Sequence, residues 1–504
     1  CNTTKGCSRD GRFRCGFPEV CIMMKTGCTG TERPKNGTGG LRRVVLALAV
    51  LLLTCVLMAG AVSATDGEWH EVTSFDDLKS NLEDGNWTKL GANIDSDSGQ
   101  ISLTSVDNAR FDLNGHTLTM GIVDRSAIVI GGESVSKRAN LTVLDSKKDG
   151  GKVNATNNYL FFVRNGSTLT LDSGKFEANY SAIAGNANGK CSNPTFTVKE
   201  GVELVSHGSV AVFLPAEGTK ARITGATITG KLGGVSIAAG DITIKDTEIS
   251  VFGSGTSLDG WTQGPNLDGS AIAIHKLSDS YKGGLTLTLL GETSLSSEND
   301  VVFHNYISDD QSSLGQTVVT IADTVDLNGK ITSATYGENC KGDGGVFKDT
   351  NGNILLYPSL NQTGVKWTGD DESGYTLTID EAGSYKLMDA FATTGSGIQI
   401  TADDVTLDGN GKKITTTGTL DGYILKVAVE DTGSAAGVTL QNLDITGTVP
   451  SAAGTYGGVT VYAGKGKASV PVTLKNSIVD MGEVKMTGGS MNPAVYFVNA
   501  SGSE

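Results

Sequence analysis

Three pairs of adjacent aspartates come closest, by residue type and spacing, to a catalytic arrangement in this sequence. They are Asp309-Asp310, Asp370-Asp371 and Asp403-Asp404. Two neighbouring carboxyl groups can divide the work of a glycosidase, because one protonates the leaving oxygen while the other activates water or attacks the sugar. Short matches of this kind arise often, and each pair is equally expected as polar residues at a strand end or corner. Alone, they identify no active site.

Oxygen ligands for a divalent cation occur in the segment Asp95-Ser96-Asp97-Ser98-Gly99. Asp95 and Asp97 are therefore candidate calcium ligands, but no later glutamate completes an EF-hand loop, so a turn is the preferred interpretation. The five histidines have no cysteine or histidine partner at metal-ligand spacing. The sequence contains no nucleophile elbow, phosphate-binding loop or dinucleotide fingerprint. We therefore expect no cofactor and no recognisable catalytic residue, which favours a protein that is not an enzyme.

Aromatic residues offer a different chemistry, because sugars are held by aromatic faces flanked by polar groups. Trp261 lies in the segment 258–269, which interrupts the spacing of the repeats and is therefore expected to protrude. Protruding loops on a rigid scaffold commonly carry binding residues, although an aromatic side chain can equally anchor its own loop. Tyr306 and Trp367 are further candidates for ligand contact.

The charge of the chain is unevenly distributed. The 504 residues have a formal net charge of −15, but residues 1–64 hold nine basic and three acidic side chains. The other 440 residues therefore carry 31 basic and 52 acidic side chains. An acidic surface of this size repels phosphate backbones, so nucleic acid is not expected as a partner.

Residues 41–64 have the features of a secretory signal. Two arginines at 42–43 precede a 19-residue apolar run over 44–62, and the small residues Ser63 and Ala64 follow. This order predicts cleavage after Ala64 and an extracellular or cell-surface location for the remainder. The run is also close to the length that spans a bilayer, so an uncleaved anchor is the alternative. Contact with a membrane is expected only through this signal or through a C-terminal anchor missing from the sequence.

Residues 1–40 differ in character, since they hold five of the eight cysteines and show no hydrophobic periodicity. Their cysteine spacing matches no metal-binding pattern, and we interpret the segment as upstream or non-native sequence. In the exported part, Cys191 and Cys340 would lie several turns apart in a repeat array. No disulfide between them is expected, because such a bridge needs closely spaced Cα atoms.

A short phrase of the form apolar-Thr-apolar recurs along the exported chain, and a second apolar phrase recurs between its copies. Each period thus holds at least two strands, which are too short to form independent hairpins. Stacked on copies of themselves, such strands bury a continuous apolar column and pair in parallel ladders. The sequence therefore predicts an all-β parallel β-helix solenoid, with a β-sandwich as the alternative. The first phrase begins at Leu141, Leu169, Phe196, Ile242, Leu285, Val318, Val405, Val438 and Val472, and the second at Leu160, Ala182, Val210, Val235, Ala271, Val301, Ile424, Val459 and Ala494.

Corners between the strands are marked by residues that tolerate positive φ, as in Asn114-Gly115 and Asn410-Gly411. The step of 43 residues between Ile242 and Leu285 is long for one turn and is expected to span two turns.

The elements of the array follow from local signals. Ser74 is a helix N-cap candidate, and Phe75, Leu78 and Leu82 recur at helical spacing before Gly85. We predict a short capping helix within an N-terminal cap at 65–100, a first array at 101–356 and a second array at 357–504. The boundary is placed where the pattern lapses, over 340–375. The last residues stop in mid-pattern, so the second array is expected to be truncated.

Two phrases of the sequence resemble known repeats. Residues 111–119 (FDLNGHTLT) and 404–414 (DVTLDGNGKKI) resemble rungs of right-handed parallel β-helix proteins of the pectin-lyase-like superfamily. The resemblance covers most of 100–504 and implies a right-handed solenoid like those of adhesin-like surface members. Catalytic segments of the polygalacturonase members, such as Asn-Thr-Asp and Gly-His-Gly, are missing. The nearest matches are Ser-His-Gly at 206–208 and Arg-Ile-Thr at 222–224, which are expected as corner or strand residues.

Two functions follow as hypotheses. The favoured one is an exported cell-surface β-helix that contacts polysaccharide, host glycans or cell-surface glycans without catalysis, as an adhesin or a display scaffold does. The alternative is a polysaccharide lyase or glycoside hydrolase of the same superfamily, whose carboxylates converge only in the folded chain.

Overall fold

The computed structural model describes residues between 67 and 499, with gaps, and they belong to one compact unit. The predicted segments 1–40 and 41–64, Trp261 and Cys340 lie outside the described residues. Across the part that is described, no helix is long and apolar enough to cross a membrane. The gaps are 123–125, 149, 187–190, 254–268, 276–282, 309–315, 337–343, 394–396, 417–421, 428–434, 448–456, 464–471 and 483–493.

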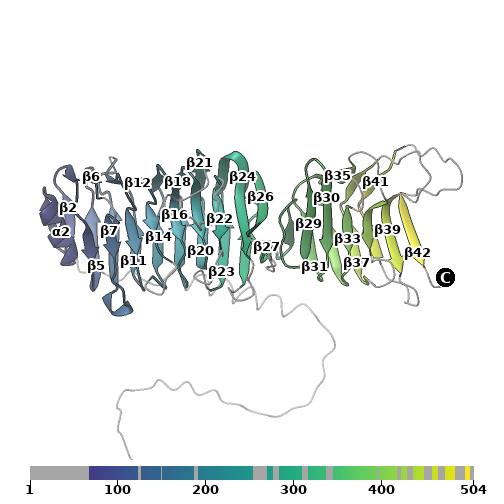
Figure 1. The fold of residues 1–504 in the computed structure, drawn as a ribbon, viewed down its shortest axis with the longest axis horizontal. Helices are drawn as coiled ribbons and strands as arrows, with labels where there is room; N and C mark the ends of the chain where they lie inside the picture. The colour runs from purple at the N-terminus through teal and green to yellow at the C-terminus, as the bar shows by residue number, and fades with distance from the viewer. Residues whose placement is uncertain are drawn as a thin grey trace, which may run out of the picture. The chain divides into compact units, whose positions relative to one another are not determined.

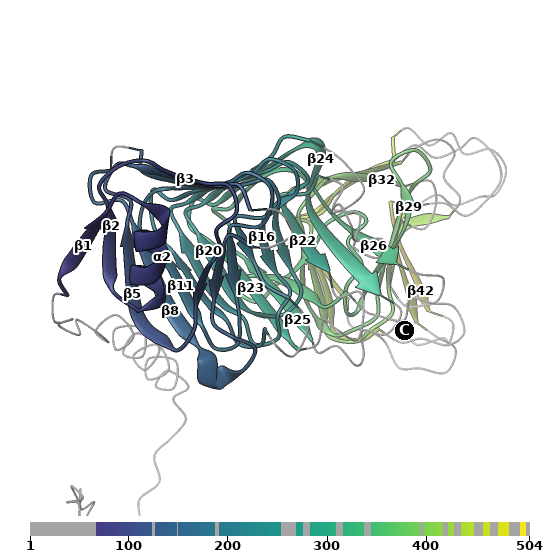
Figure 2. The same cartoon turned by 60° about the vertical axis from the view of Figure 1, so that its left-hand side comes forward.

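The predicted capping helix is confirmed as α2 (Phe75–Glu83). The Ser74 side chain accepts a hydrogen bond from the Asp77 backbone N–H at 3.2 Å, and Leu78 and Leu82 are buried. α2 packs against β1 (Trp69–Val72), β2 (Trp87–Leu90), β3 (Ile94–Ser96), β4 (Ile101–Leu103) and β5 (Val106–Asp112), the first strands of the stack (Figure 2). The amphipathic helix therefore covers apolar side chains of the first strands.

Replacing Ser74 by Ala is expected to lower the free energy of unfolding by about 1 kcal/mol, because one N-terminal backbone donor of α2 loses its acceptor. Urea denaturation followed by circular dichroism measures this change. Ser74→Thr is the matched control, because a threonine hydroxyl can accept the same hydrogen bond from the Asp77 N–H and can still donate to the Asp77 carboxylate, so it should retain most of the stability. Equal losses in both variants would contradict the capping role.

Nearly all strands are parallel and belong to long sheets (Figure 1). Sheet A contains β1, β2, β5, β8 (Ala139–Leu144), β11 (Thr168–Leu171), β14 (Thr195–Val198), β17 (Lys220–Thr224), β20 (Gly240–Lys245), β23 (Leu285–Leu290), β25 (Thr317–Ile321), β27 (Val346–Asp349), β28 (Ile354–Leu356), β31 (Gly383–Leu387), β34 (Val405–Asp408), β37 (Val438–Gln441) and β40 (Val472–Lys475).

Sheet B has two rows, which meet at the long strand β24 (Ser294–Ser308) and its partner β26 (Asp326–Tyr336). The first row is β3, β6 (Thr117–Met120), β9 (Lys152–Ala155), β12 (Lys175–Ala178), β15 (Glu203–Ser206), β18 (Thr227–Gly230) and β21 (Glu248–Val251). The second row is β4, β7 (Ile128–Ile130), β10 (Phe161–Val163), β13 (Ile183–Ala184), β16 (Val210–Leu214), β19 (Gly233–Ile237) and β22 (Ile272–His275).

Beyond residue 360, two smaller sheets, C and D, occupy the place that sheet B has in the first part of the stack. Sheet C contains β29 (Val365–Asp370), β30 (Gly374–Ile379), β33 (Ile398–Ile400), β36 (Tyr423–Val427), β39 (Gly457–Ala463) and β42 (Val495–Asn499). Sheet D contains β32 (Phe391–Thr393), β35 (Lys413–Thr416), β38 (Asp444–Thr446) and β41 (Ile478–Asp480).

The chain visits three rows in a fixed order, so that each strand of the first stack generally pairs with the strand three elements later. In sheet A, Leu169 of β11 is in register with Leu141 of β8 and with Phe196 of β14. Apolar residues thus lie on apolar residues from rung to rung and form one core column. The all-β, parallel prediction is confirmed, and the pairing is consistent with a β-helix-like solenoid.

The two recurring phrases occupy different rows. The nine copies of the apolar-Thr-apolar phrase given above, from Leu141 to Val472, lie in sheet A, whereas the second phrase lies in the second row of sheet B and in sheet C. The third strand of each turn, in the first row of sheet B or in sheet D, was not recognised in the sequence. Its apolar members, such as Val153 in β9, alternate with polar residues, and most of these strands lack the repeated phrase, although β6 contains it as Leu118-Thr119-Met120.

The prediction that the 43-residue step spans two turns is wrong. Ile242 of β20 pairs directly with Leu287 of β23, and the whole of β20 is in register with β23. One turn therefore separates these strands. The extra length lies in the interval between β21 and β22, where residues 252–271 connect the two rows of sheet B.

Antiparallel pairing interrupts the parallel order near the predicted boundary of the arrays. β27 pairs antiparallel with β28, and β29 pairs antiparallel with β30. The buried apolar residues also fall into two clusters, one running from Val72 to Leu360 and the other from Leu356 to Met481. The stack thus has two hydrophobic cores that meet around residues 355–360.

Corner asparagines adopt the positive φ expected for them and link adjacent rungs. Asn114 (φ 50°) donates from its side-chain amide to the Leu90 carbonyl at 2.8 Å, and Asn410 (φ 51°) donates to the Leu387 carbonyl at 3.1 Å. A short amide side chain tolerates this backbone conformation and satisfies a carbonyl of the preceding turn.

Candidate functional site

An open groove lies over the outer side of β4, β7 and β10. Ile101, Ile128 and Phe161 are in register and buried, and they point toward the core. Because side chains alternate along a strand, the next residues, Ser102, Val129 and Phe162, point outward. Three turns of the chain therefore place one outward residue each in a row, which forms the floor of the groove.

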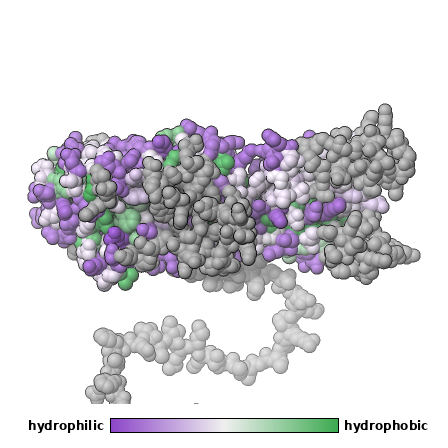
Figure 3. Space-filling view, viewed as in Figure 1, coloured by the Kyte–Doolittle hydropathy of each residue, from purple (hydrophilic) through white to green (hydrophobic). Residues whose placement is uncertain are grey.

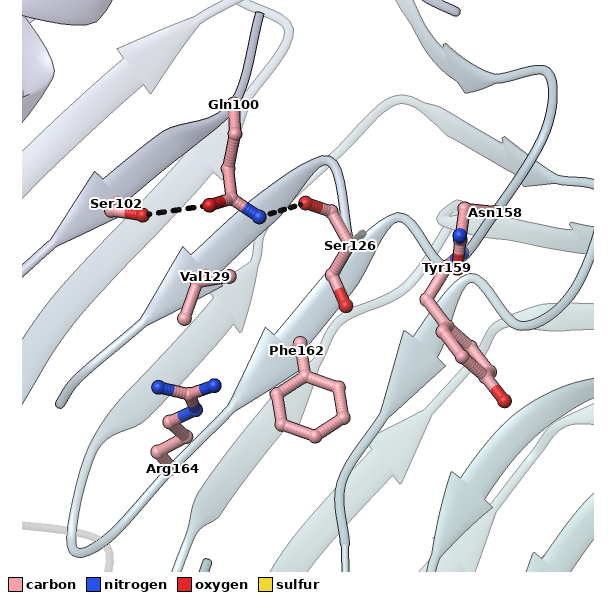
Figure 4. A pocket seen from close by; sticks show the side chains of 8 residues that line it. All are labelled: Gln100, Ser102, Ser126, Val129, Asn158, Tyr159, Phe162 and Arg164. Atoms are coloured by element: carbon pink, nitrogen blue, oxygen red, sulfur yellow. Dashed lines mark hydrogen bonds between the residues drawn. The ribbon is translucent and has the colours of Figure 1, made fainter. Parts of the chain in front are cut away.

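The groove encloses about 450 Å³ and is lined by eight residues from these three turns. Figure 4 shows polar side chains along one side and Phe162 beside Arg164 on the other. Gln100 Nε2 donates to the Ser126 carbonyl at 2.6 Å, and Ser102 Oγ donates to Gln100 Oε1 at 3.4 Å. The lining residues are Gln100, Ser102, Ser126, Val129, Asn158, Tyr159, Phe162 and Arg164.

Aromatic rings form a half-buried cluster at the groove. The ring centroids of Tyr159 and Phe162 lie 6.5 Å apart, and those of Tyr159 and Tyr180 lie 5.5 Å apart. Arg164 places its guanidinium carbon 5.5 Å from the centroid of Phe162, within cation–π distance. Burial, with a smaller contribution from Tyr180, raises the pKa of Tyr159, so its hydroxyl stays protonated at neutral pH and can donate a hydrogen bond.

This arrangement combines apolar ring faces, amides, hydroxyls and one cation on a rigid floor. Sugars present apolar C–H faces and rims of hydroxyl groups, which fit such a mixture. Figure 3 shows apolar residues in green among hydrophilic ones in purple near the N-terminal end of the stack. None of the eight lining residues is a carboxylate. The groove is thus suited to binding a sugar, and its lining supplies no pair of acids for hydrolysis.

Two of the predicted aromatic site residues, Tyr306 and Trp367, are not among the residues that line the groove. Trp367 is 4 % exposed and packs edge-to-face against Tyr375 and Phe391, with centroids 5.9 and 5.2 Å away, so its ring faces are not open to a sugar. Tyr306 lies on β24 in register with His275 of β22, and its side chain is outside the described set. Trp261 lies outside the described residues altogether.

The predicted oxygen-rich segment 95–99 lies at the end of a strand, and a second aspartate-containing segment, at 349–353, forms a turn. Asp95 is exposed on β3, and Ser96 Oγ accepts a hydrogen bond from the Gly99 N–H at 3.1 Å. In the turn between β27 and β28, Asp349 accepts from the backbone N–H groups of Asn351 and Asn353 at 2.8 and 2.9 Å. Within the described ranges, no three His, Cys, Asp or Glu side chains gather as metal ligands.

The adjacent aspartates serve local structure where they are described. Asp371 pairs with Lys330 at 2.7 Å, and Asp370 accepts backbone hydrogen bonds within the β29–β30 turn. Asp403 accepts from the Ala436 N–H at 2.6 Å, and Asp404 is a corner residue with φ 54°. Asp309 and Asp310 lie outside the described residues.

A cluster of charged residues surrounds Glu177 on the first row of sheet B. Glu177 is 8 % exposed and lies 2.6 Å from Lys152, 3.2 Å from Lys175 and 3.3 Å from His207. Burial alone would raise the pKa of Glu177, but hydrogen bonds from Lys152, His207 and Lys175 lower it below its usual value. The carboxylate is therefore held ionised by its neighbours, which suits a structural ion network better than a general acid. Cys191, which lies between β13 and β14, is a buried free thiol.

Sequence reasoning missed the groove. Its residues come from separate turns, at 100–102, 126–129 and 158–164, and no local motif connects them. One signal was present in the sequence, namely an aromatic residue, Phe162, two positions before Arg164. The structure shows that Phe162 is the outward residue of β10, whose other two residues are buried. Searches found no match to the chain among protein-family models, curated proteins or solved structures.

Proposed function

We propose that this chain is an exported, cell-surface protein built as a right-handed parallel β-helix of the pectin-lyase-like kind, which binds polysaccharide without cleaving it. Right-handedness is what parallel strands joined by crossovers almost always adopt. The apolar run over 44–62, with its preceding arginines, supports export. The observation that carries the proposal is the groove, which combines an aromatic cluster with amide and hydroxyl groups.

The rigidity of the groove favours this function. Val129 is fixed by parallel backbone pairing between Ser102 and Phe162, and Phe162 is fixed between Val129 and Ala184. Ser102 lies on the edge strand β4 and pairs only with Val129. A preformed surface loses less conformational entropy on binding a polymer than a flexible surface does, so more of the interaction free energy contributes to affinity. Polymer chains can also contact several turns at once, because successive turns repeat at about 4.8 Å.

Replacing Tyr159 or Phe162 by Ala is expected to weaken polysaccharide binding about tenfold, which corresponds to about 1.4 kcal/mol. The measurement is isothermal titration of the purified chain with a panel containing laminarin, xylan, galactomannan, polygalacturonate and chondroitin sulfate. Phe252→Ala is the matched control, because Phe252 is 43 % exposed and lies at the end of β21, away from the groove.

Reducing ends and unsaturated products are measured in the same mixtures. Binding without new products supports the proposal. Release of either product would favour the lyase or hydrolase alternative, and failure to bind any member of the panel would contradict glycan recognition.

A further inference from the structure

An open pocket lies at the place where sheet B ends and sheet A continues. β26 pairs only with β24 and is the last strand of sheet B in the described part of the chain (Figure 1). Sheet A runs on from β25 through β27 and β28 to β31. Within the residues that the structure describes, no strand therefore pairs with the side of β26 that faces away from β24.

This end of sheet B leaves one column of core side chains uncovered. Ile249, Leu295 and Leu327 are in register on β21, β24 and β26. Ile249 and Leu295 are fully buried, whereas Leu327 is only partly buried, although it packs against the same core. An apolar surface that is covered elsewhere in the stack is thus accessible here, and such surfaces often mark binding sites.

The pocket, which we call the junction pocket, encloses about 340 Å³ and so has the size of a site for a small molecule. Its apolar lining includes Val325, Leu327, Leu355, Tyr357 and Met388. Leu355 and Tyr357 are buried, and the other three are partly buried and pack against the first core. The apolar part of the junction pocket is thus made of core-type side chains that a ligand can reach.

The junction pocket is lined from both sides of the boundary between the two cores. Leu327 lies on β26, whereas Lys386 lies on β31 and Met388 directly follows it. The neighbouring residues of β31, Tyr385 and Leu387, are buried in the second core. A ligand in the junction pocket therefore contacts both parts of the stack and stabilises the folded chain at their boundary.

The polar lining of the junction pocket holds more acid than base. Asp323 and Asp389 are its acids, and Lys386 is its single cation. Lys386 Nζ lies 3.2 Å from Asp323 Oδ1 and 4.0 Å from Asp349 Oδ2, a buried carboxylate that does not line the pocket. The charge of Lys386 is therefore shared by two carboxylates. Asp389 forms no ion pair within 4 Å in the described part of the chain, so its charge has no direct partner.

Asp389 acts on the apolar end of the junction pocket through Tyr357. As a whole residue Asp389 is exposed, but partial burial of its carboxyl group raises its pKa, and Lys412 opposes this shift. Burial also raises the pKa of Tyr357, with further contributions from Asp389 and Asp323. Both carboxylates are thus near the phenol. A partly desolvated carboxylate is stabilised by a nearby cation, and an aromatic ring also attracts an ammonium group.

We infer that the junction pocket binds a small organic amine in its cationic form. The apolar body of the amine packs on Leu327, Met388 and Tyr357. Its ammonium group is held by Asp389, with Asp323 beside it. The site is separate from the groove over β4, β7 and β10 and does not depend on the function proposed for that groove.

The test is isothermal titration of the purified chain with four probes: tryptamine and phenethylamine, which are cations; tryptophol, a neutral analogue of tryptamine; and indole-3-acetate, an anionic analogue. Tryptamine is expected to bind about tenfold more tightly than tryptophol and to raise the melting temperature, because it pairs with a carboxylate and binds only the folded chain. Indole-3-acetate should bind more weakly than tryptophol, since Asp389 and Asp323 repel it.

Asp389→Asn keeps the shape of the side chain and removes its charge. It is expected to weaken tryptamine binding about tenfold and to leave tryptophol binding unchanged. Met388→Ala should weaken the binding of both, because it removes apolar contact alone. Asp380→Asn is the matched control for the loss of one negative charge, because Asp380 is exposed and does not line the junction pocket.

Three results would each overturn the inference. They are failure of both amines to bind, equal affinity of the wild type for tryptamine and tryptophol, and unchanged or equally reduced tryptamine binding in Asp389→Asn and Asp380→Asn. A loss confined to Asp389→Asn supports it. Circular dichroism and melting of each variant without ligand show that folding does not account for the change in affinity.

Discussion

Acidification from pH 6.5 to pH 5 is expected to lower the free energy of unfolding by several kcal/mol, because two buried histidines resist protonation in the folded chain. Burial lowers the pKa of His275 to about 3 and the pKa of His304 to about 4. His275 is fully buried between the ring of Phe213, at a centroid distance of 5.4 Å, and the Ser236 hydroxyl, 2.8 Å from Nδ1. In the unfolded chain both histidines titrate near pH 6.5.

The direction of the effect follows from proton binding. Below pH 6.5 the unfolded chain binds protons that the folded chain excludes, so stability falls as pH falls, down to about pH 4 for His304 and about pH 3 for His275. Each histidine contributes a slope of about 1.4 kcal/mol per pH unit, or about 2 kcal/mol by pH 5. Carboxylates whose pKa is lowered by hydrogen bonds, such as Glu177, lose their stabilising effect only as the pH falls below the pKa of an unfolded glutamate, near 4.5.

Urea denaturation at pH 6.5, 6.0, 5.5 and 5.0 measures this slope before the carboxylates titrate. His304→Phe is expected to reduce the slope by about one half, since it removes one of the two groups. His70→Asn is the matched control, because His70 is exposed on β1. A slope that is unchanged in His304→Phe would show that the pH dependence comes from other groups.

Replacing Phe161 by Ala is expected to lower the free energy of unfolding by about 3–5 kcal/mol, because the change leaves a large cavity in the first core. Phe161 is 0 % exposed and packs edge-to-face on Phe176 of the neighbouring row, with ring centroids 5.6 Å apart. It also pairs in register with Ile128 and Ile183, so the cavity would touch the turns on both sides.

The adjacent residue provides the control for this prediction. Phe162 points outward and is half-buried, so Phe162→Ala is expected to cost no more than about 1 kcal/mol of stability while it weakens polysaccharide binding. Thermal and urea denaturation of both variants, together with binding titrations, separate the two roles. Similar losses of stability in Phe161→Ala and Phe162→Ala would contradict the assigned directions of the two rings.

Much of the fold was readable in the sequence for a physical reason. Strands in adjacent turns have the same pattern of buried and exposed positions, so the apolar-Thr-apolar phrase repeats in nine strands of sheet A. The helix at Phe75–Glu83 was equally clear, because its N-cap and its apolar spacing lie within one short segment. The prediction that two turns separate Ile242 from Leu285 is wrong, because a long connection within one turn leaves the pairing of the strands unchanged.

The sequence by itself determined the direction of side chains where apolar and polar residues alternate, as in Leu141-Thr142-Val143, but it did not determine which of the adjacent apolar residues Phe161 and Phe162 faces the core. Only the tertiary structure decided which outward side chains meet. Ser102, Val129 and Phe162 are 27 and 33 residues apart, and they share a groove because three turns of unequal length return to the same register. Trp367 illustrates the converse, since nothing in its neighbouring sequence shows that Tyr375 and Phe391 cover its ring. The alternation of residues along a strand determines which face each side chain points to. Which side chains become neighbours depends on how the turns of the chain stack on one another.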